Sequence, residues 1–299
     1  MPNSAIPEKI SFTSHGAELV GDLFVPAGGG TPGPAVVVTG SWTTVKEQMA
    51  GRYARGLAEN GITAFAFDFR GYGESGGAPR DFESPEQKSE DIRAAVGYLR
   101  SRADVDGDRI GALGVCAGAG YTAVAATLDS DIRSLALVAP WLHNSELVAG
   151  LYGGQQRIGE LVALGEAAAE RYQETGTVEY VPAVSTEDPN AAMYGPFDYY
   201  LDPARGAIPQ WGNRFAVMAW PGWLTFDPIA AAPGVSVPTL LVHSHAAAIP
   251  EGAERFHAAL PADKELRWLP ADSQFDFYDR EDTVTAALDA VAEHFGKTL

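Results

Sequence analysis

The segment GALGVCAGAGY, residues 111–121, holds the only cysteine of a 299-residue chain, Cys116, among four glycines. The apolar run DRIGALGVC (108–116) is typical of a strand buried on both faces of a parallel sheet. The run that follows at once, AGAGYTAVAATL (117–128), is typical of a helix. We therefore expect Cys116 to lie on a tight turn from the carboxyl end of a buried strand into a helix.

The same alternation of strand and helix runs through most of the chain. An opening hairpin is expected at 9–28, and a helix is expected to start at Ser84-Pro85, an N-cap followed by proline at the first helical position. Further buried strands are expected at PAVVVTG (34–40) and ITAFAFDF (62–69). Strands are also expected at IRSLALVAP (132–140), VPTLLVHS (237–244) and KELRWLP (264–270). This alternation predicts an α/β fold with a mostly parallel, doubly wound sheet.

Residues 140–233 break the pattern. They show no convincing strand, only helical patterns such as ELVALGEAAAERYQETG (160–176), in which Gly176 is the expected C-cap. Four of the six tryptophans lie in this segment, which makes it a candidate pocket wall. We expect a core of residues 1–139 and 234–299 and a helical, aromatic-rich lid of residues 140–233, inserted after the sixth strand.

Composition excludes several classes of function. With 21 basic and 39 acidic residues the net charge is −18, which repels phosphate backbones and makes nucleic acid an unlikely partner. A single cysteine excludes an internal disulfide and a multi-cysteine metal site. No apolar run is long enough to span a bilayer, and MPNSAIPEKISF (1–12) lacks the features of a secretory signal. We expect a cytoplasmic protein that does not bind membranes.

The residues around Cys116 match a nucleophile elbow, G-x-S-x-G, with cysteine in place of serine. Gly114 and Gly118 supply the small residues that a strained strand-to-helix turn requires. The N-terminus of the following helix stabilises negative charge, so a thiolate is expected there. A small buried cysteine with no chemical role is the structural alternative.

Three further segments carry a resemblance to a known family. The chain resembles the α/β-hydrolases, in the branch similar to dienelactone hydrolase, which uses a cysteine nucleophile. The resemblance rests on SHGAELVGDLFVPAG (14–28), VVVTGSWTTVKEQ (36–48) and DFRGYGESGG (68–77), in addition to the elbow. It implies an α/β-hydrolase fold and an oxyanion hole formed by the backbone N–H groups of Ala117 and of Trp42 or its neighbour Ser41.

The chain departs from the family at both partners of the nucleophile. The resemblance places an acid after the strand TLLVHS, yet residues 246–248 are alanines. It places a histidine in the loop after KELRWLP, where this chain has Gln274. Glutamine cannot carry a proton, but its amide can donate a hydrogen bond to a thiolate or to a substrate oxygen.

Other residues are candidates for the missing base and for the pocket. His245 lies in the loop that should hold the acid, and either it acts as a relocated base or it is an exposed residue without a role. His143 and Trp141 open the lid and are candidate pocket residues. Asp276 is a candidate for activating water, although such loop aspartates more often cap turns.

These observations lead to three hypotheses. The first is a cysteine-dependent hydrolase acting on an ester, lactone or thioester of an apolar or aromatic small molecule, with Cys116, His245 and Gln274 as catalytic candidates. The second is a lyase, isomerase or cyclase on the same scaffold, and the third is an inactive relative that binds a small molecule. No metal and no cofactor is expected, because no His/Asp/Glu cluster shows ligand spacing. The sequence leaves open whether the protein forms a homodimer.

Overall fold

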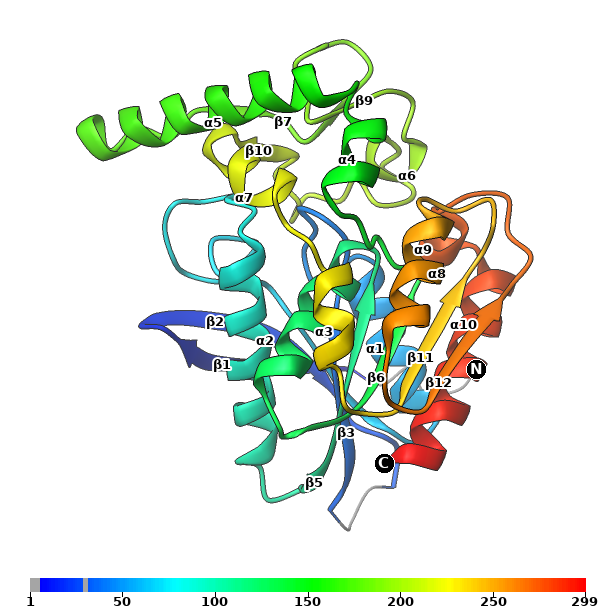
Figure 1. Cartoon of the computed structure of the whole chain (residues 1–299). Helices are drawn as coiled ribbons and strands as arrows, with labels where there is room; N and C mark the ends of the chain where they lie inside the picture. The colour runs from blue at the N-terminus through cyan, green and yellow to red at the C-terminus, as the bar shows by residue number, and fades with distance from the viewer. Residues whose placement is uncertain (1–5, 29–31) are drawn as a thin grey trace.

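The computed structural model describes residues 6–28 and 32–299 and contains one eight-stranded sheet in the order β1-β2-β4-β3-β5-β6-β11-β12 (Figure 1). Strands β1 and β2 form an antiparallel hairpin, β2 pairs antiparallel with β4, and the remaining pairs are parallel. The strands are β1 (Glu8–Ser14), β2 (Ala17–Phe24), β3 (Gly33–Thr39), β4 (Thr63–Phe67), β5 (Val105–Val115), β6 (Ile132–Val138), β11 (Thr239–His243) and β12 (Lys264–Trp268). The expected mostly parallel α/β sheet is confirmed.

Helices cover both faces of the sheet. Helices α1 (Met49–Glu59) and α10 (Glu281–Thr298) pack together on one face, and α2 (Pro85–Arg100), α3 (Ala117–Leu128) and α8 (Pro250–Ala259) lie on the other (Figure 1). Helix α2 begins where its sequence predicts, because the Ser84 hydroxyl accepts from the Gln87 N–H and Pro85 occupies the first turn.

The topology positions a site at the carboxyl ends of β3 and β5. From β3 the chain crosses to β4 on one side, and from β4 it returns to β5 on the other side. Ligands of open α/β sheets bind in the crevice that such a reversal leaves at the carboxyl ends of the strands. The loop after β3, residues 40–48, and the turn after β5, which holds Cys116, therefore lie next to each other.

The segment between β6 and η2 is not purely helical. It contains the long helix α5 (Gln155–Thr175), which ends at Gly176 in the left-handed conformation as expected, and the short helices α4 (Ser145–Leu151), α6 (Asp198–Leu201) and α7 (Trp220–Leu224). The expectation of no strand is wrong, because four strands of two or three residues form two small sheets. They are β7 (Tyr180–Pro182) with β10 (Arg214–Ala216), and β8 (Val184–Ser185) with β9 (Met193–Tyr194). Segments this short carry no readable alternation.

The inserted segment lies above the carboxyl edge of the sheet (Figure 1). Its limits at residues 140 and 233 stay a prediction, and the remaining short helices are η1 (Val217–Ala219), η2 (Ile229–Gly234) and, after β12, α9 (Asp276–Asp279). None of the helices within the described ranges combines the length and the apolar character that a bilayer crossing requires. Residues 1–5 of the N-terminal stretch considered above lie outside the described residues.

Candidate active site

Cys116 occupies the tight turn between β5 and α3. Its φ of 56° lies in the left-handed region, where a non-glycine residue is strained. A Cβ on Gly114 would lie 2.5 Å from the Ala119 Cα, and one on Gly118 would lie 2.4 Å from the Gly40 carbonyl oxygen. Only glycine fits at these two positions, so the sequence pattern and the geometry of the elbow agree.

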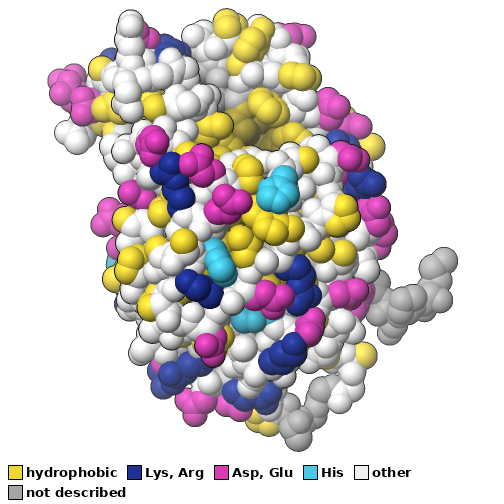
Figure 2. Space-filling model, turned by 45° about the vertical axis from the view of Figure 1, so that its right-hand side comes forward, with side chains coloured by type: hydrophobic (Ala, Val, Ile, Leu, Met, Phe, Trp, Pro, Cys, Tyr) yellow, Lys and Arg dark blue, Asp and Glu magenta, His cyan; other side chains and the backbone are white. Residues whose placement is uncertain are grey.

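The sulfur opens on a cavity of about 470 Å³ between the sheet and the inserted segment. Figure 2 shows hydrophobic side chains gathered in a hollow between the inserted segment and the rest of the molecule. The cavity is lined by Ser41, Trp42, Cys116, Trp141, Leu151, Tyr152, Ala192, Met193, Tyr194, Phe197, Tyr200, Trp223, Ala246, Ala247, Ala248, Gln274, Phe275 and Tyr278. Within the part of the chain that the structure describes, no charged side chain and no histidine lines this cavity.

Hydroxyl and amide groups surround the sulfur. The side chains of Ser41, Tyr278 and Gln274 line the cavity with it, and hydrogen bonding from these groups and from the Ala117 N–H acts to lower the pKa of the thiol. The Tyr200 hydroxyl donates to the Ser41 Oγ at 2.9 Å, and the Ser41 Oγ lies 3.2 Å from the Tyr278 hydroxyl. A connected chain of hydroxyl groups therefore lies beside Cys116 in the cavity wall.

Burial decides the protonation state of Cys116. Its side chain is 5% exposed, and this burial raises the pKa of the thiol above its usual value, against the donors that lower it. The expectation of a thiolate at the helix N-terminus is therefore wrong for the ligand-free cavity. At neutral pH the residue is a thiol.

Gln274 is fixed at the position expected for a histidine. Its Oε1 accepts from the Ala248 N–H at 3.0 Å, and its Nε2 donates to the Ala139 carbonyl oxygen at 2.7 Å and to the Tyr278 hydroxyl at 3.3 Å. Because one end faces a donor and the other an acceptor, the amide has a single orientation. Gln274 thus links the loop of residues 246–248 to Ala139, the residue that follows β6.

The loop after β3 leaves one backbone donor unused. The Ser41 N–H points at the Met49 Sδ at 3.4 Å, and the Thr43 N–H donates to the Glu83 Oε2 at 3.0 Å. Within residues 6–28 and 32–299 the N–H of Trp42 between them has no acceptor. Of the two candidates for the second oxyanion donor, this accounting favours Trp42 over Ser41.

A buried carboxylate holds this loop in place. Glu83, which is fully buried, accepts from the hydroxyls of Tyr72 at 2.9 Å and Tyr121 at 2.5 Å and pairs with the Lys88 ammonium at 2.7 Å. Burial lowers the pKa of Lys88, and the ion pair with Glu83 opposes that shift. Glu83 thereby joins α2, α3 and the loop that carries Trp42.

Comparison with known proteins fits this architecture. The family model described as "Serine aminopeptidase, S33" matches residues 46–177. The uncharacterized protein PA2218 of Pseudomonas aeruginosa is 31% identical over 304 residues, which cover 97% of this chain and 80% of that protein. Its crystal structure aligns with a TM-score of 0.87 at 28% identity, over 99% of this chain and 95% of that one. The chain belongs to the α/β-hydrolase superfamily.

Two further relatives extend this α/β-hydrolase assignment. The uncharacterized protein YcjY of Escherichia coli is 32% identical over 272 residues, 89% of each chain. The thiohydrolase aneE of Aspergillus aculeatus is 36% identical over 129 residues, 43% of this chain and 40% of that protein. Membership of the α/β-hydrolase superfamily and similarity to these relatives support hydrolase-type activity in general.

His143 lies behind the cavity wall of this α/β-hydrolase and does not line it. The Trp141 Nε1 donates to its Nδ1 at 3.0 Å, and its Nε2 donates to the Trp223 carbonyl oxygen at 3.1 Å. Burial lowers the pKa of His143 to about 4. With both nitrogens engaged, His143 positions two tryptophans of the wall, of which the predicted pocket residue Trp141 does line the cavity.

The structure does not bring His245 or Asp276 to the cavity. His245 is exposed and stacks on Trp268 with ring centroids 3.9 Å apart. The Asp276 carboxylate accepts from the Asp272 N–H and the Ser273 hydroxyl and pairs with Arg280, so it closes the turn that leads into α9. Neither side chain is placed to move a proton at the Cys116 sulfur.

Both tyrosines of the hydroxyl chain, Tyr278 and Tyr200, are missing from the predicted site residues. Tyr278 lies four residues after Gln274, one helical turn on, and this spacing could have revealed it. Tyr200 reaches Ser41 across 159 residues of sequence, and no local signal marks it.

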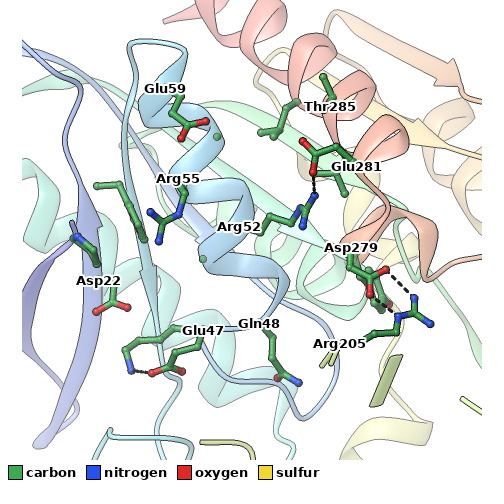
Figure 3. A pocket seen from close by; sticks show the side chains of 18 of the residues that line it. Asp22, Glu47, Gln48, Arg52, Arg55, Glu59, Arg205, Asp279, Glu281 and Thr285 are labelled. Carbon is green, nitrogen blue, oxygen red and sulfur yellow. Dashed lines mark hydrogen bonds and ion pairs between the residues drawn. The ribbon is translucent and has the colours of Figure 1, made fainter. Parts of the chain in front are cut away.

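A second hollow of about 600 Å³ runs beside α1 and α10, and it is lined by charges (Figure 3). Arg52 pairs with Glu281 at 2.5 Å, and Arg205 makes two bonds to Asp279. We call this hollow the charged groove. These two ion pairs join elements that lie on opposite sides of the groove.

One acidic cluster at the end of this groove has metal-ligand spacing that the sequence did not reveal. Oxygens of Glu47, Asp68 and Glu74 lie within 4.8 Å of one another. The Lys46 ammonium bonds to all three, at 2.6, 2.9 and 2.7 Å, so a cation of the protein already binds the cluster.

Proposed function

We propose that the protein is a cysteine-dependent acyl-transfer enzyme of hydrolase type, with Cys116 as nucleophile toward a thioester, ester or lactone of a neutral, apolar or aromatic small molecule. The observation that carries the proposal is the sulfur of a strained elbow, open to an uncharged aromatic cavity. The dienelactone-hydrolase-like branch is part of the same proposal, on the segments 36–48 and 68–77.

The reaction proceeds through an S-acyl enzyme. The Cys116 sulfur forms a bond to the carbonyl carbon, and the oxyanion lies between the N–H groups of Ala117 and Trp42. Collapse of the tetrahedral intermediate breaks the bond to the leaving thiol or alcohol, which departs with one proton. Water then attacks the acyl carbon and breaks its bond to sulfur, so the hydroxyl of the water stays on the acid and its proton goes to the Cys116 sulfur. The relative named a thiohydrolase supports the choice of substrate bond.

The cavity selects an uncharged acyl group. Its wall is built mainly from Trp, Tyr, Phe, Met, Leu and Ala side chains, and none of the described residues that line it is a cation that could balance an anionic substituent. Burying an unpaired charge costs several kcal/mol, whereas an aromatic ring gains about 25 cal/mol for each Å² removed from water.

The decisive experiment is acylation by a neutral aromatic thioester. The S-benzoyl thioester of N-acetylcysteamine is incubated with the wild-type protein and with Cys116→Ala, and intact mass and free thiol are followed. We expect a benzoyl adduct on the wild type only. A wild type that is never acylated would overturn the proposal and leave the inactive binding relative as the better description. Turnover that Cys116→Ala retains in full would overturn it as well, because the nucleophile would then not be Cys116.

A second function is favoured by one observation. No histidine, aspartate or glutamate among the described lining residues can activate water. A lyase, isomerase or cyclase reaction needs no water and suits this wall. Product mass separates the two, because hydrolysis adds water to the substrate and these reactions either leave the mass unchanged or split the molecule without adding water.

A further inference from the structure

The hydroxyl chain beside Cys116 ends at a residue that the family pattern does not assign to catalysis. Tyr278 is 2% exposed and lies in the wall that separates the cavity from the charged groove, lining both. Its hydroxyl lies 3.2 Å from the Ser41 Oγ and 3.3 Å from the Gln274 Nε2, and all three side chains line the cavity together with Cys116. Tyr278 therefore bonds to both of the other polar side chains that share the cavity wall with the sulfur and act on its pKa.

Hydrogen-bond accounting fixes the direction of these contacts. The Gln274 amide has one orientation, so its Nε2 donates to Tyr278, and the Tyr278 oxygen accepts there. Tyr200 in turn donates to Ser41. Tyr278 therefore keeps its own proton for the sulfur or for Ser41, and keeps one lone pair that can receive a proton.

We infer that Tyr278 is the proton relay of Cys116, with Ser41 as its neighbour in the chain, and that this relay makes thioesters the substrate class. The inference rests on the proposed function. As the Cys116 sulfur bonds to the acyl carbon, its proton passes to the Tyr278 oxygen. The tyrosine proton passes, directly or through Ser41, to the departing sulfur of the substrate.

This relay needs neither a base nor an acid of its own. One thiol enters the reaction, one thiol leaves it, and one proton moves between them, so the atoms and charges balance without a histidine. A free thiol has a pKa of about 8.5, so a departing thiolate is far less basic than the alkoxide that an ester would release. Burial raises the pKa of Tyr278 well above its usual value, so it stays protonated and passes a proton on instead of removing one.

The test compares Tyr278→Phe with Tyr53→Phe. The Tyr53 hydroxyl is buried and donates to the carbonyl oxygen of Phe277, the neighbour of Tyr278, but it does not line the cavity. It reports what a lost buried hydroxyl does to this region. The measurement is the rate of S-benzoylation of Cys116 by the benzoyl thioester from pH 6 to pH 8.5, beside alkylation by iodoacetamide at pH 9.5.

We expect the wild-type acylation rate to be nearly independent of pH, because the neutral thiol reacts. Tyr278→Phe should slow acylation about 100-fold at pH 7 and make it rise about tenfold per pH unit, since only the thiolate can then react. Alkylation at pH 9.5 should change less than about threefold, because it starts from the thiolate. Tyr53→Phe should leave both rates and the pH profile unchanged.

The results distinguish a failure of the relay from a failure of the proposed function. A wild type whose acylation already rises tenfold per pH unit, or a Tyr278→Phe variant that acylates at the wild-type rate, overturns the relay and leaves the proposed function intact. Equal losses of acylation and alkylation in Tyr278→Phe also overturn the relay, because they show a displaced sulfur. No acylation of the wild type defeats the proposed function and the relay together.

Discussion

Two hollows meet at Tyr278 and differ in one property above all. The charged groove is the larger, about 600 Å³, and its side chains form ion pairs across α1, α10 and the inserted segment (Figure 3). The cavity at Cys116 is about 470 Å³ and carries no charge on its described wall. The larger hollow is thus the one whose arginines already have partners within the chain.

The difference between the two hollows lies in which of their polar groups remain available to a ligand. In the groove each described arginine has an interaction within the chain, so the charges hold elements together. In the cavity a thiol and the N–H of Trp42 are left for a ligand. Unsatisfied groups, and not volume, mark the candidate site.

The largest expected effect comes from the carboxylate beneath the cavity. Glu83→Gln removes the partner of a buried ammonium and weakens the hold on the Thr43 N–H, so we expect a loss of about 3–5 kcal/mol in the free energy of unfolding. Urea denaturation measures it. The double variant Glu83→Gln/Lys88→Met is the control and should recover much of the loss, because no unpaired charge remains. A single variant as stable as the wild type would contradict this assignment.

The free energy of unfolding should depend on pH through His143, which lies behind the cavity wall. Its pKa is about 4 in the folded protein and near 6.5 when unfolded, so between these values the unfolded chain binds the extra proton. The free energy of unfolding should therefore fall by about 3 kcal/mol as the pH drops from 6.5 to 4, with no further loss from this residue below that range. His143→Gln, which keeps a donor and an acceptor but does not titrate, should flatten the curve. An unchanged slope would show that His143 is not the titrating group.

A charge introduced at the cavity wall should cost less than loss of the buried pair. Gln274→Glu replaces the donor to the Ala139 carbonyl oxygen by an acceptor, so we expect a loss of about 1–3 kcal/mol that is greatest above pH 7, where the carboxylate ionises. Thermal unfolding at pH 5 and pH 8 measures it. Gln274→Met is the uncharged control, and equal losses in both variants would show that charge is not the cause.

The smallest effect is expected in the groove. Glu281→Gln breaks the ion pair with Arg52. Because the Glu281 side chain is 87% exposed and the Arg52 side chain 35% exposed, the free energy of unfolding should change by less than about 1 kcal/mol. S-benzoylation of Cys116 should be unchanged. A fall in that rate would mean that the groove takes part in the reaction and would remove the contrast between the two hollows.

Local patterns carried most of the fold. Buried apolar runs predicted the strands, Ser84-Pro85 predicted the start of α2, and the glycines around Cys116 predicted the elbow. Each of these signals lies within a few residues of the feature it predicts. The two- and three-residue strands of the inserted segment have no such signal, because tertiary pairing alone defines them.

The site was predictable only in part. Cys116, Gln274, Ser41, Trp42 and Trp141 do meet at one cavity, but His245 turns outward onto Trp268. The thiolate expectation weighed the helix N-terminus and could not weigh burial, which the sequence does not show. Glu83 reaches Thr43 across 40 residues, and such a contact is visible only after folding.

The uncharged wall also bears on how a reaction would end. Hydrolysis of a neutral acyl group produces a carboxylate, which would be the only anion in a cavity whose described wall offers no cation. Solvation in bulk water then favours departure of the acid by several kcal/mol, while the neutral substrate is retained. The cavity would therefore bind its substrate far more tightly than its product, and product inhibition would stay weak even at high conversion.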